Sequence, residues 1–174
     1  NAGLAALIGA RAAHRMRQSA RRDAWLAGIA HDNNLKTARL MTITELLVDD
    51  HQPEAALDAV AELNASGTRH IHALKWAMKA NQQARNWPEV LRLVRSLDKH
   101  KALHPALSSR LRELAYEALL ADPAHDAESL RRVWNTVPQE DRIQPYIACV
   151  AATALNARGM HDEFRDYLRD HGGG

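Results

Sequence analysis

The chain contains little cysteine, little phenylalanine and no long apolar run, and each shortage excludes a class of protein. Cys149 is the only cysteine among 174 residues, which excludes a disulfide framework and a thiolate metal cluster. Its apolar neighbours predict that it is a small core side chain. Phe164 is the only phenylalanine, and runs of β-branched residues are missing, so strands find little support. The longest small, apolar run, 2–10, is about half the length of a membrane-spanning helix.

Catalytic and cofactor motifs are missing as well. The sequence has no G-x-G-x-x-G, no H-E-x-x-H and no G-x-S-x-G, and its eight glycines are scattered or terminal. Among the ten histidines, His100 and His104 have a spacing that can chelate a metal on a helix. They flank a predicted helix end before Pro105, however, which weakens that geometry. We therefore predict no enzyme, no cofactor and no metal site.

The residues that are abundant are alanine and leucine, which are strong helix formers, and the apolar residues recur at helical spacing. Two helix-turn-helix units occupy 37–98. Their second helices each begin with a proline, Pro53 and Pro88, which suits the first turn of a helix. Equivalent apolar residues lie about 34 residues apart, the period of tetratricopeptide (TPR) repeats, and we call this interval the repeat period. These equivalent pairs are Ala56 and Val90, Val60 and Val94, and Leu63 and Leu97.

We predict an all-α fold, a TPR-like right-handed superhelix of about five antiparallel helical hairpins. One hairpin alone cannot bury its apolar face, whereas stacked hairpins share a continuous core. Short predicted turns make neighbouring helices antiparallel. The whole of 1–171 is predicted as one domain, followed by a flexible tail at 172–174. The hairpins are predicted at about 4–31, 35–66, 69–100, 106–137 and 143–171.

A binding groove is predicted on the concave face of this superhelix. The first helix of each hairpin lines that face, where such repeat proteins bind partners. With the register taken from Ala56 and Val90, the groove combines cations, an amide and tyrosines, which favours a peptide or an acidic segment; a solvated face is the alternative. Trp76 lies one step off the apolar stripe of its helix. The predicted groove residues are Met41, Glu45, His72, Lys75, Lys79, Gln82, Arg112, Tyr116 and Tyr146.

Basic residues are concentrated near the beginning of the chain, although the net charge is only +2. They precede the first acidic residue, Asp23. A basic N-terminal helix suits anionic lipid or nucleic acid, and a solvated surface is the simpler interpretation. The predicted membrane-proximal basic face comprises Arg11, Arg15, Arg21 and Arg22.

Several stretches of the sequence together resemble the soluble region of the HemY family. Members of this family are proteobacterial TPR proteins linked to late protohaem synthesis. They span most of residues 4–168, and their combined order and spacing are more specific than any single stretch. The stretches are Arg11-Ala12-Ala13-His14-Arg15, Ala20-Arg21-Arg22-Asp23-Ala24-Trp25-Leu26, Glu45-Leu46-Leu47-Val48-Asp49, Gln52-Pro53-Glu54-Ala55-Ala56-Leu57, Trp87-Pro88-Glu89-Val90-Leu91, Leu103-His104-Pro105 and Leu130-Arg131-Arg132-Val133-Trp134.

The resemblance implies a bacterial inner-membrane protein with two N-terminal membrane helices and this region on the cytoplasmic side. The chain lacks those helices and begins without methionine, so we expect a soluble fragment. The implied function is a non-enzymatic scaffold whose partners are proteins, with late haem-pathway enzymes as the expected ones. The alternative is a carrier that binds haem or porphyrin directly through His72. Nucleic-acid binding through the N-terminal arginines is less favoured, because the net charge is near neutral, and we predict no nucleic-acid partner.

Overall fold

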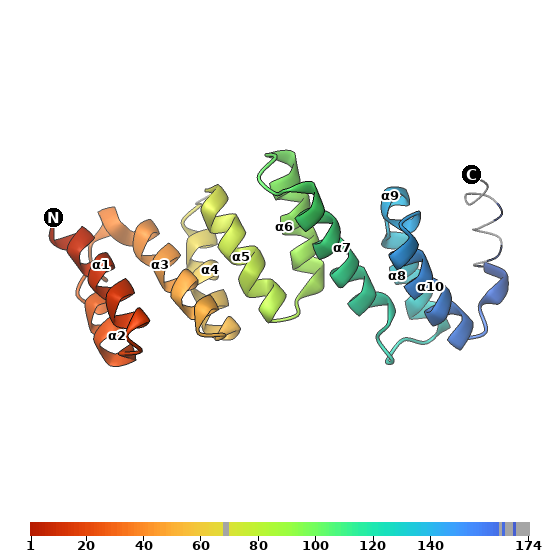
Figure 1. Ribbon diagram of the computed structural model, residues 1–174, viewed down its shortest axis with the longest axis horizontal. Coiled ribbons are helices and arrows are strands. Elements are labelled where there is room, and N and C mark those ends of the chain that lie inside the picture. The colour runs from red at the N-terminus through yellow and green to blue at the C-terminus, as the bar shows by residue number, and fades with distance from the viewer. Residues whose placement is uncertain (68–69, 164, 166–168, 170–174) are drawn as a thin grey trace.

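The computed structural model describes residues 1–67, 70–163, 165 and 169, and every regular element within these residues is a helix. This confirms the all-α class. The helices follow one another in a row, with α1 at one end and α10 at the other (Figure 1). Their bounds are α1 Ala2–Arg15, α2 Ser19–Ala27, the short 3-10 helix η1 Asn33–Leu35, α3 Lys36–Asp49, α4 Pro53–Ala65, α5 Ile71–Gln83, α6 Trp87–Lys99, α7 Pro105–Leu120, α8 Ala127–Thr136, α9 Gln139–Arg142 and α10 Pro145–Ala157.

The predicted helices differ from the observed ones mainly near the two ends of the chain. α2 ends before Gly28, whereas the predicted helix continued to His31. The segment 139–141, predicted as part of a turn, lies in the short helix α9. α10 begins with Pro145 in its first turn, slightly later than predicted, because proline is tolerated there. The predicted last helix and tail, 161–174, lie largely outside the described residues.

The turns between helices repeat with the same backbone geometry. Arg17, His51 and Arg85 follow α1, α3 and α5 at intervals of one repeat period, and have φ angles of 58°, 55° and 58°. Gly67 and Lys101 follow α4 and α6 at the same interval, with φ angles of 75° and 52°. After α1, α3 and α5, the next N–H donates to the carbonyl five residues earlier at 2.8 to 2.9 Å, which closes the helix end. The repeat period of the sequence is therefore also a period of the backbone.

Helices that are neighbours in the sequence pack against each other. Contacts join α1 to α2, α3 to α4, α5 to α6 and α7 to α8. Within the described residues, further contacts join α1 to α3, α3 to α5 and α7 to α10, but α5 and α7 have no comparable contact. Instead, α7 packs on α6. The row of odd-numbered helices that begins with α1, α3 and α5 is thus interrupted before α7.

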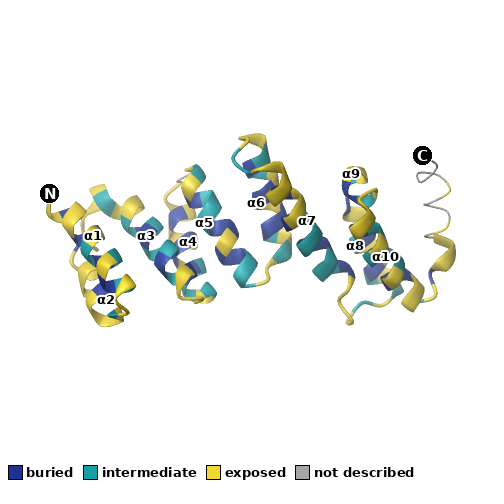
Figure 2. Ribbon diagram, in the orientation of Figure 1, coloured by how far each residue is buried: buried dark blue, intermediate teal, exposed yellow. Residues whose placement is uncertain are grey.

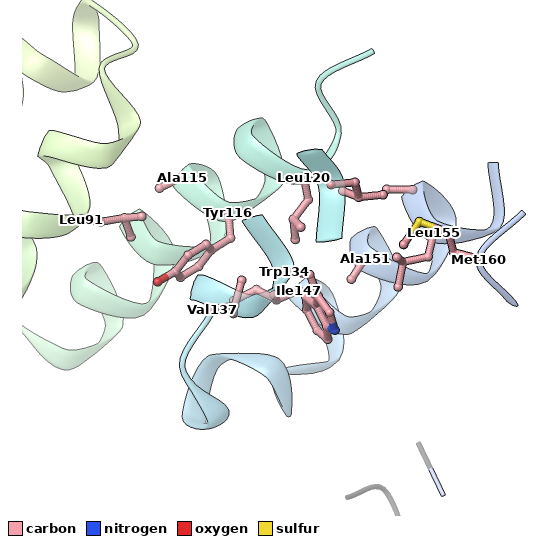
Figure 3. Packing of buried hydrophobic residues seen from close by; sticks show 12 residues of the cluster. Leu91, Ala115, Tyr116, Leu120, Trp134, Val137, Ile147, Ala151, Leu155 and Met160 are labelled. Atoms are coloured by element: carbon pink, nitrogen blue, oxygen red, sulfur yellow. The ribbon is translucent and has the colours of Figure 1, made fainter. Parts of the chain in front are cut away.

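The core is a series of clusters along this row, and α6 is its most deeply buried helix. Val90, Val94 and Leu97 on α6 have no exposed surface. A larger cluster joins α7, α8 and α10 around Leu120 and Ile147, as Figure 3 shows. More residues are exposed on α1 and α2 than on α5 and α6 (Figure 2). On α1 the buried residues are small: Gly3, Ala6, Ala10 and Ala13.

Two predictions about apolar segments are tested by these helices. Cys149 is exposed, so its prediction as a core side chain is wrong. It lies two residues from both Ile147 and Ala151, which are buried, and residues two apart face different sides of a helix. Within the described residues, no helix is long and apolar enough to cross a membrane.

Candidate functional site

A groove of about 490 Å³ crosses the first three odd-numbered helices, and we call it the N-terminal groove. Its volume is in the range of pockets that hold small ligands or parts of a peptide, about 300 to 1,000 Å³. Each of the three helices contributes charged or polar side chains. The residues that line it are Arg11, His14, Arg15, Glu45, Leu46, Val48, Asp49, His51, Trp76, Lys79 and Gln83.

The lining of the groove follows the repeat period. Arg11 on α1, Glu45 on α3 and Lys79 on α5 occupy equivalent positions, and all three line the groove. One helical turn further along each helix the same is true of a second set, Arg15, Asp49 and Gln83. Because equivalent positions of stacked helices face the same way, the repeat places these side chains on one surface.

An ion pair connects α1 and α3 across this surface. The guanidinium of Arg11 donates to the Glu45 carboxylate at 2.6 Å, and a second, longer bond of 3.4 Å reaches the Thr42 hydroxyl. The side chains of Arg11 and Glu45 are 39% and 29% exposed. The pair is therefore only partly shielded from water, and its contribution to stability is expected to be no more than about 1 kcal/mol.

On α5, the cation of the groove contacts an aromatic ring and not a carboxylate. The ammonium of Lys79 lies 4.5 Å from the centre of the Trp76 ring, which is a cation–π contact. Trp76 also packs against the small cluster formed by Val48, Ala56 and Ala80, so its ring is held in place. Lys79 itself is exposed. The groove thus offers a fixed aromatic surface with a cation above it.

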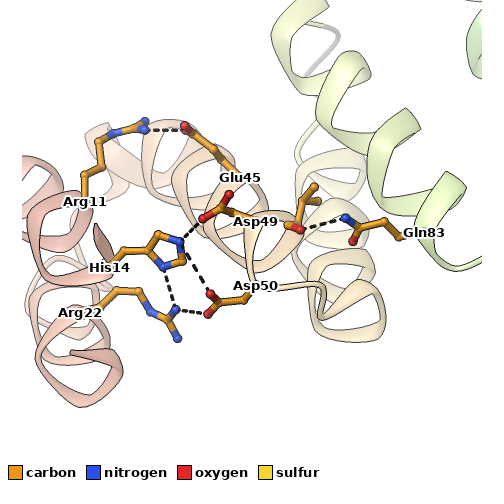
Figure 4. A network of polar contacts seen from close by, with 8 residues as sticks. Arg11, His14, Arg22, Glu45, Asp49, Asp50 and Gln83 are labelled. Carbon is orange, nitrogen blue, oxygen red and sulfur yellow. Dashed lines mark hydrogen bonds and ion pairs between the residues drawn. The ribbon is translucent and has the colours of Figure 1, made fainter. Parts of the chain in front are cut away.

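A polar network connects α1, α2 and α3 beside the groove and shares His14 and Asp49 with its lining, as Figure 4 shows. Arg22 is 6% exposed and donates to Asp50 at 2.6 Å and to the Nδ1 atom of His14 at 3.1 Å. Burial acts to lower the pKa of Arg22, but hydrogen bonds with Asp50 and Asp23 outweigh it and raise that pKa. On the other side of the ring, Nε2 of His14 lies 2.6 Å from Asp49.

The spacing of this network would allow a metal ion, but Arg22 opposes one. Ligand atoms of His14, Asp49 and Asp50 lie within 4.8 Å of one another. Arginine can only donate, so Nδ1 of His14 accepts from Arg22 and Nε2 carries the proton that Asp49 accepts. A metal on Nε2 would need the proton on Nδ1, directly against the Arg22 N–H. The contacts therefore favour an ion-pair network that holds three helices together.

Some of the predicted groove residues line the N-terminal groove, and the others lie outside it. Glu45 and Lys79 line the N-terminal groove. Met41 packs against the cluster around Leu40, and Lys75 is half-buried on α5. His72 is exposed, stacks on the ring of His70 with 5.4 Å between ring centres, and is not among the lining residues. No contact of His72 favours the haem carrier, which stays a prediction.

Three further predicted groove residues lie outside the lining of the N-terminal groove. Tyr116 is 4% exposed and lies in the core, where burial raises the pKa of its phenol. It lies one repeat period after Gln82 and two after Val48, which is also buried. Arg112 lies one repeat period after the buried Met78, and its guanidinium pairs with Asp98 at 3.4 Å and Asp141 at 3.1 Å. None of Gln82, Tyr116 and Arg112 lines the N-terminal groove.

Tyr146 is placed on the surface of α10, outside this groove. It is 40% exposed, and the Arg110 guanidinium lies 5.9 Å from the centre of its ring. A hydrogen bond with Glu117 raises the pKa of its phenol. The side chain is accessible, as predicted, but it faces residues of α7 rather than the groove across α1, α3 and α5.

The predicted basic face is divided by the structure. Arg11 and Arg22 are engaged with the carboxylates of Glu45, Asp23 and Asp50. Arg15 and Arg21 are exposed, and Arg15 lines the N-terminal groove. Only part of the predicted positive surface is therefore open to an anionic partner.

Sequence reasoning missed a second groove, of about 420 Å³, between α7 and α10. It is more apolar than the first. The repeat period could have indicated one of its residues, because Glu117 lies one repeat period after Gln83, which lines the N-terminal groove. The residues that line it are Glu117, Ala121, Pro123, Val150, Thr153, Ala154, Ala157 and Arg158.

Comparisons with family models, with curated proteins and with solved structures found no match to this chain. The class that the structure defines is an all-α chain of consecutively packed helices with a polar groove across the first three odd-numbered ones. The resemblance to the HemY family stays a prediction.

Proposed function

We propose that this chain is a TPR-like interaction module, a right-handed superhelix of about five hairpins whose N-terminal groove binds a segment of a partner protein. The observation that carries the proposal is the repeat: Arg11, Glu45 and Lys79 are separated by one repeat period each and line one groove. Turns with similar φ angles recur at the same period. Short connections between packed helices are typical of such modules.

A scaffold is favoured over an enzyme by what the groove contains. Contacts of Arg11 with Glu45 and of His14 with Asp49 join α1 to α3, and a cation–π contact within α5 adds to this polar surface. On the resemblance, we propose that the partners are late haem-pathway enzymes at the cytoplasmic face of a bacterial inner membrane. That part of the proposal rests on the quoted sequence stretches alone.

Photo-crosslinking tests the groove as a binding surface. A photoreactive amino acid in place of Lys79 should form a discrete crosslinked product in a bacterial membrane extract. The matched control carries the same amino acid in place of Lys99, which is exposed on α6 away from the groove. Mass spectrometry of the product identifies the partner. Equal products from both positions, or none from position 79, would contradict the groove proposal. A partner unrelated to haem synthesis would contradict only the HemY-like part.

A charge-reversal variant tests the same surface without a crosslinker. Lys75→Glu combined with Lys79→Glu should abolish capture of the crosslinked partner in a pull-down, because Lys79 lines the groove and Lys75 lies one turn before it on α5. The control is Lys36→Glu with Lys99→Glu, which changes the net charge equally at exposed positions outside the lining. Circular dichroism should show both variants folded. Unchanged capture by the first variant would move the site away from this groove.

A further inference from the structure

Both carboxylates that line the N-terminal groove, Glu45 and Asp49, have partners on α1, whereas two cations of the groove have no carboxylate partner among the described residues. Arg11 pairs with Glu45 at 2.6 Å, and the Asp49 carboxylate is engaged by His14. Lys79 occupies the position on α5 that is equivalent to Arg11 and Glu45, yet no carboxylate of the described residues lies within ion-pair distance of it. Arg15, at the rim of the same groove, also has no carboxylate partner among the described residues.

The next helix does not supply the missing acid. Charges at the equivalent positions alternate in sign along the row: Arg11, Glu45, Lys79 and then Glu113. Glu113, however, pairs with Arg110 on its own helix at 3.2 Å. α5 and α7 also lack the contact that joins α1 to α3 and α3 to α5. Glu45 and Glu113, the acids at the equivalent positions on α3 and α7, thus pair with Arg11 and Arg110, and Lys79 has no carboxylate within ion-pair distance among the described residues.

We propose that an acidic segment of a partner protein supplies this acid, with its carboxylates pairing with Lys79 and Arg15 and its backbone lying against Trp76. The inference rests on the proposed function and specifies the chemistry of the partner. The Trp76 ring covers one side of the Lys79 ammonium, and the remaining donors are free to reach a carboxylate. Arg15 presents a planar fork that can bind a carboxylate in a bidentate manner.

The same groove disfavours a polyphosphate. Nucleic acid brings closely and regularly spaced negative charges, and it is bound by surfaces that neutralise several phosphates at once. Glu45 and Asp49 lie between Arg15 and Lys79 in the row of helices and would repel such a backbone. A protein segment with separated carboxylates can place its charges against the two cations and uncharged residues against the acids.

Fluorescence anisotropy with a labelled peptide tests the proposal. The probe is a short peptide that alternates glutamates with leucine and alanine, and the matched peptide carries glutamine in place of every glutamate. We expect saturable binding of the glutamate peptide, weakened by added salt, and no binding of the glutamine peptide. Arg15→Glu with Lys79→Glu should weaken binding by about tenfold or more, because two exposed ion pairs are lost and replaced by repulsion.

The control variant is Lys36→Glu with Lys99→Glu, which has the same net charge and should change the affinity by less than about twofold. Equal weakening by both variants would overturn the proposal, because attraction would then follow net charge and not the site. Tighter binding of single-stranded DNA than of the glutamate peptide would also overturn it. If the peptide fails to bind while position 79 still crosslinks a partner, the groove remains a binding surface and only the acidic chemistry is wrong.

Discussion

At the scale of single residues, burial separates leucines that look alike in the sequence. Leu97 on α6 has no exposed surface, whereas Leu107 on α7 is 47% exposed. Leu97→Ala should lower the free energy of unfolding by about 2 to 5 kcal/mol, because it removes apolar contacts and leaves a cavity. Leu107→Ala is the matched control and should change it by no more than about 0.5 kcal/mol. Urea unfolding of both variants checks this; similar losses would contradict the burial of α6.

Arg112 shows how a charged residue is accommodated at a position that is buried on other helices. The equivalent residues on α3 and α5 are Thr44 and Met78, both buried. On α7 the position carries a cation, and α9 brings Asp141, which is 3% exposed, to within 3.1 Å of it. Burial raises the pKa of Asp141 above its usual value, although the nearby Arg112 acts to lower it. A buried pair of this kind fixes the position of α9 more than it adds stability.

The raised pKa of Asp141 has a consequence for stability against pH. Between the unfolded pKa, about 3.9, and the higher folded pKa, the folded chain holds a proton that the unfolded chain has lost. This group therefore makes stability fall as the pH rises through that window. Asp141→Asn removes this carboxyl, so its free energy of unfolding lacks the decrease. The free energy of unfolding of the wild type minus that of the variant should therefore become smaller as the pH rises.

Urea unfolding at several pH values above about 3.5 measures this difference. Asp58→Asn, at an exposed position on α4, is the control for loss of one carboxylate. Parallel curves for the wild type and Asp141→Asn would show that Asp141 does not titrate differently in the folded chain.

At the scale of elements, the turns after α4 and α6 form a natural pair for comparison. Gly67 and Lys101 hold equivalent left-handed positions, and nothing lies within 4 Å of a side chain added at Gly67. Gly67→Ala should therefore destabilise the protein by about 1 kcal/mol through backbone conformation alone. Lys101→Gly should have the opposite sign, since glycine adopts this conformation without strain. Thermal unfolding checks both variants, and a shift of the same sign in both would contradict the shared geometry.

The elements also show why some features could be predicted and others could not. Helices and turns were predictable because Pro53, Pro88 and the apolar spacing encode them locally. The burial of Tyr116 could not be predicted, because an amphipathic residue occurs both on the surface and in the core. The short helix α9 depends on contacts with α7 and α10 that the local sequence does not contain.

At the scale of the whole molecule, residues that are one repeat period apart in the sequence come into contact in the fold. The Arg11–Glu45 pair spans one repeat period and could have been predicted by pairing opposite charges at that interval. The network of His14, Arg22 and Asp50 could not, since its members come from three different positions of the repeat. Among the described residues, helices that lie next to one another in the row make such contacts and so hold the row together.

A linear stack should not open everywhere with equal ease, and this gives a prediction for the whole chain. α1 buries only glycine and alanine and contacts α2 and α3, whereas α6 buries large side chains and packs between α5 and α7. Local opening requires less free energy where fewer apolar contacts are lost. Hydrogen exchange followed by mass spectrometry should therefore show the fastest exchange in peptides from α1 and α2 and the slowest in those from α6. Leu97→Ala should accelerate exchange in α5, α6 and α7 more than in α1. Uniform protection along the chain would instead mean that the helices open as one cooperative unit.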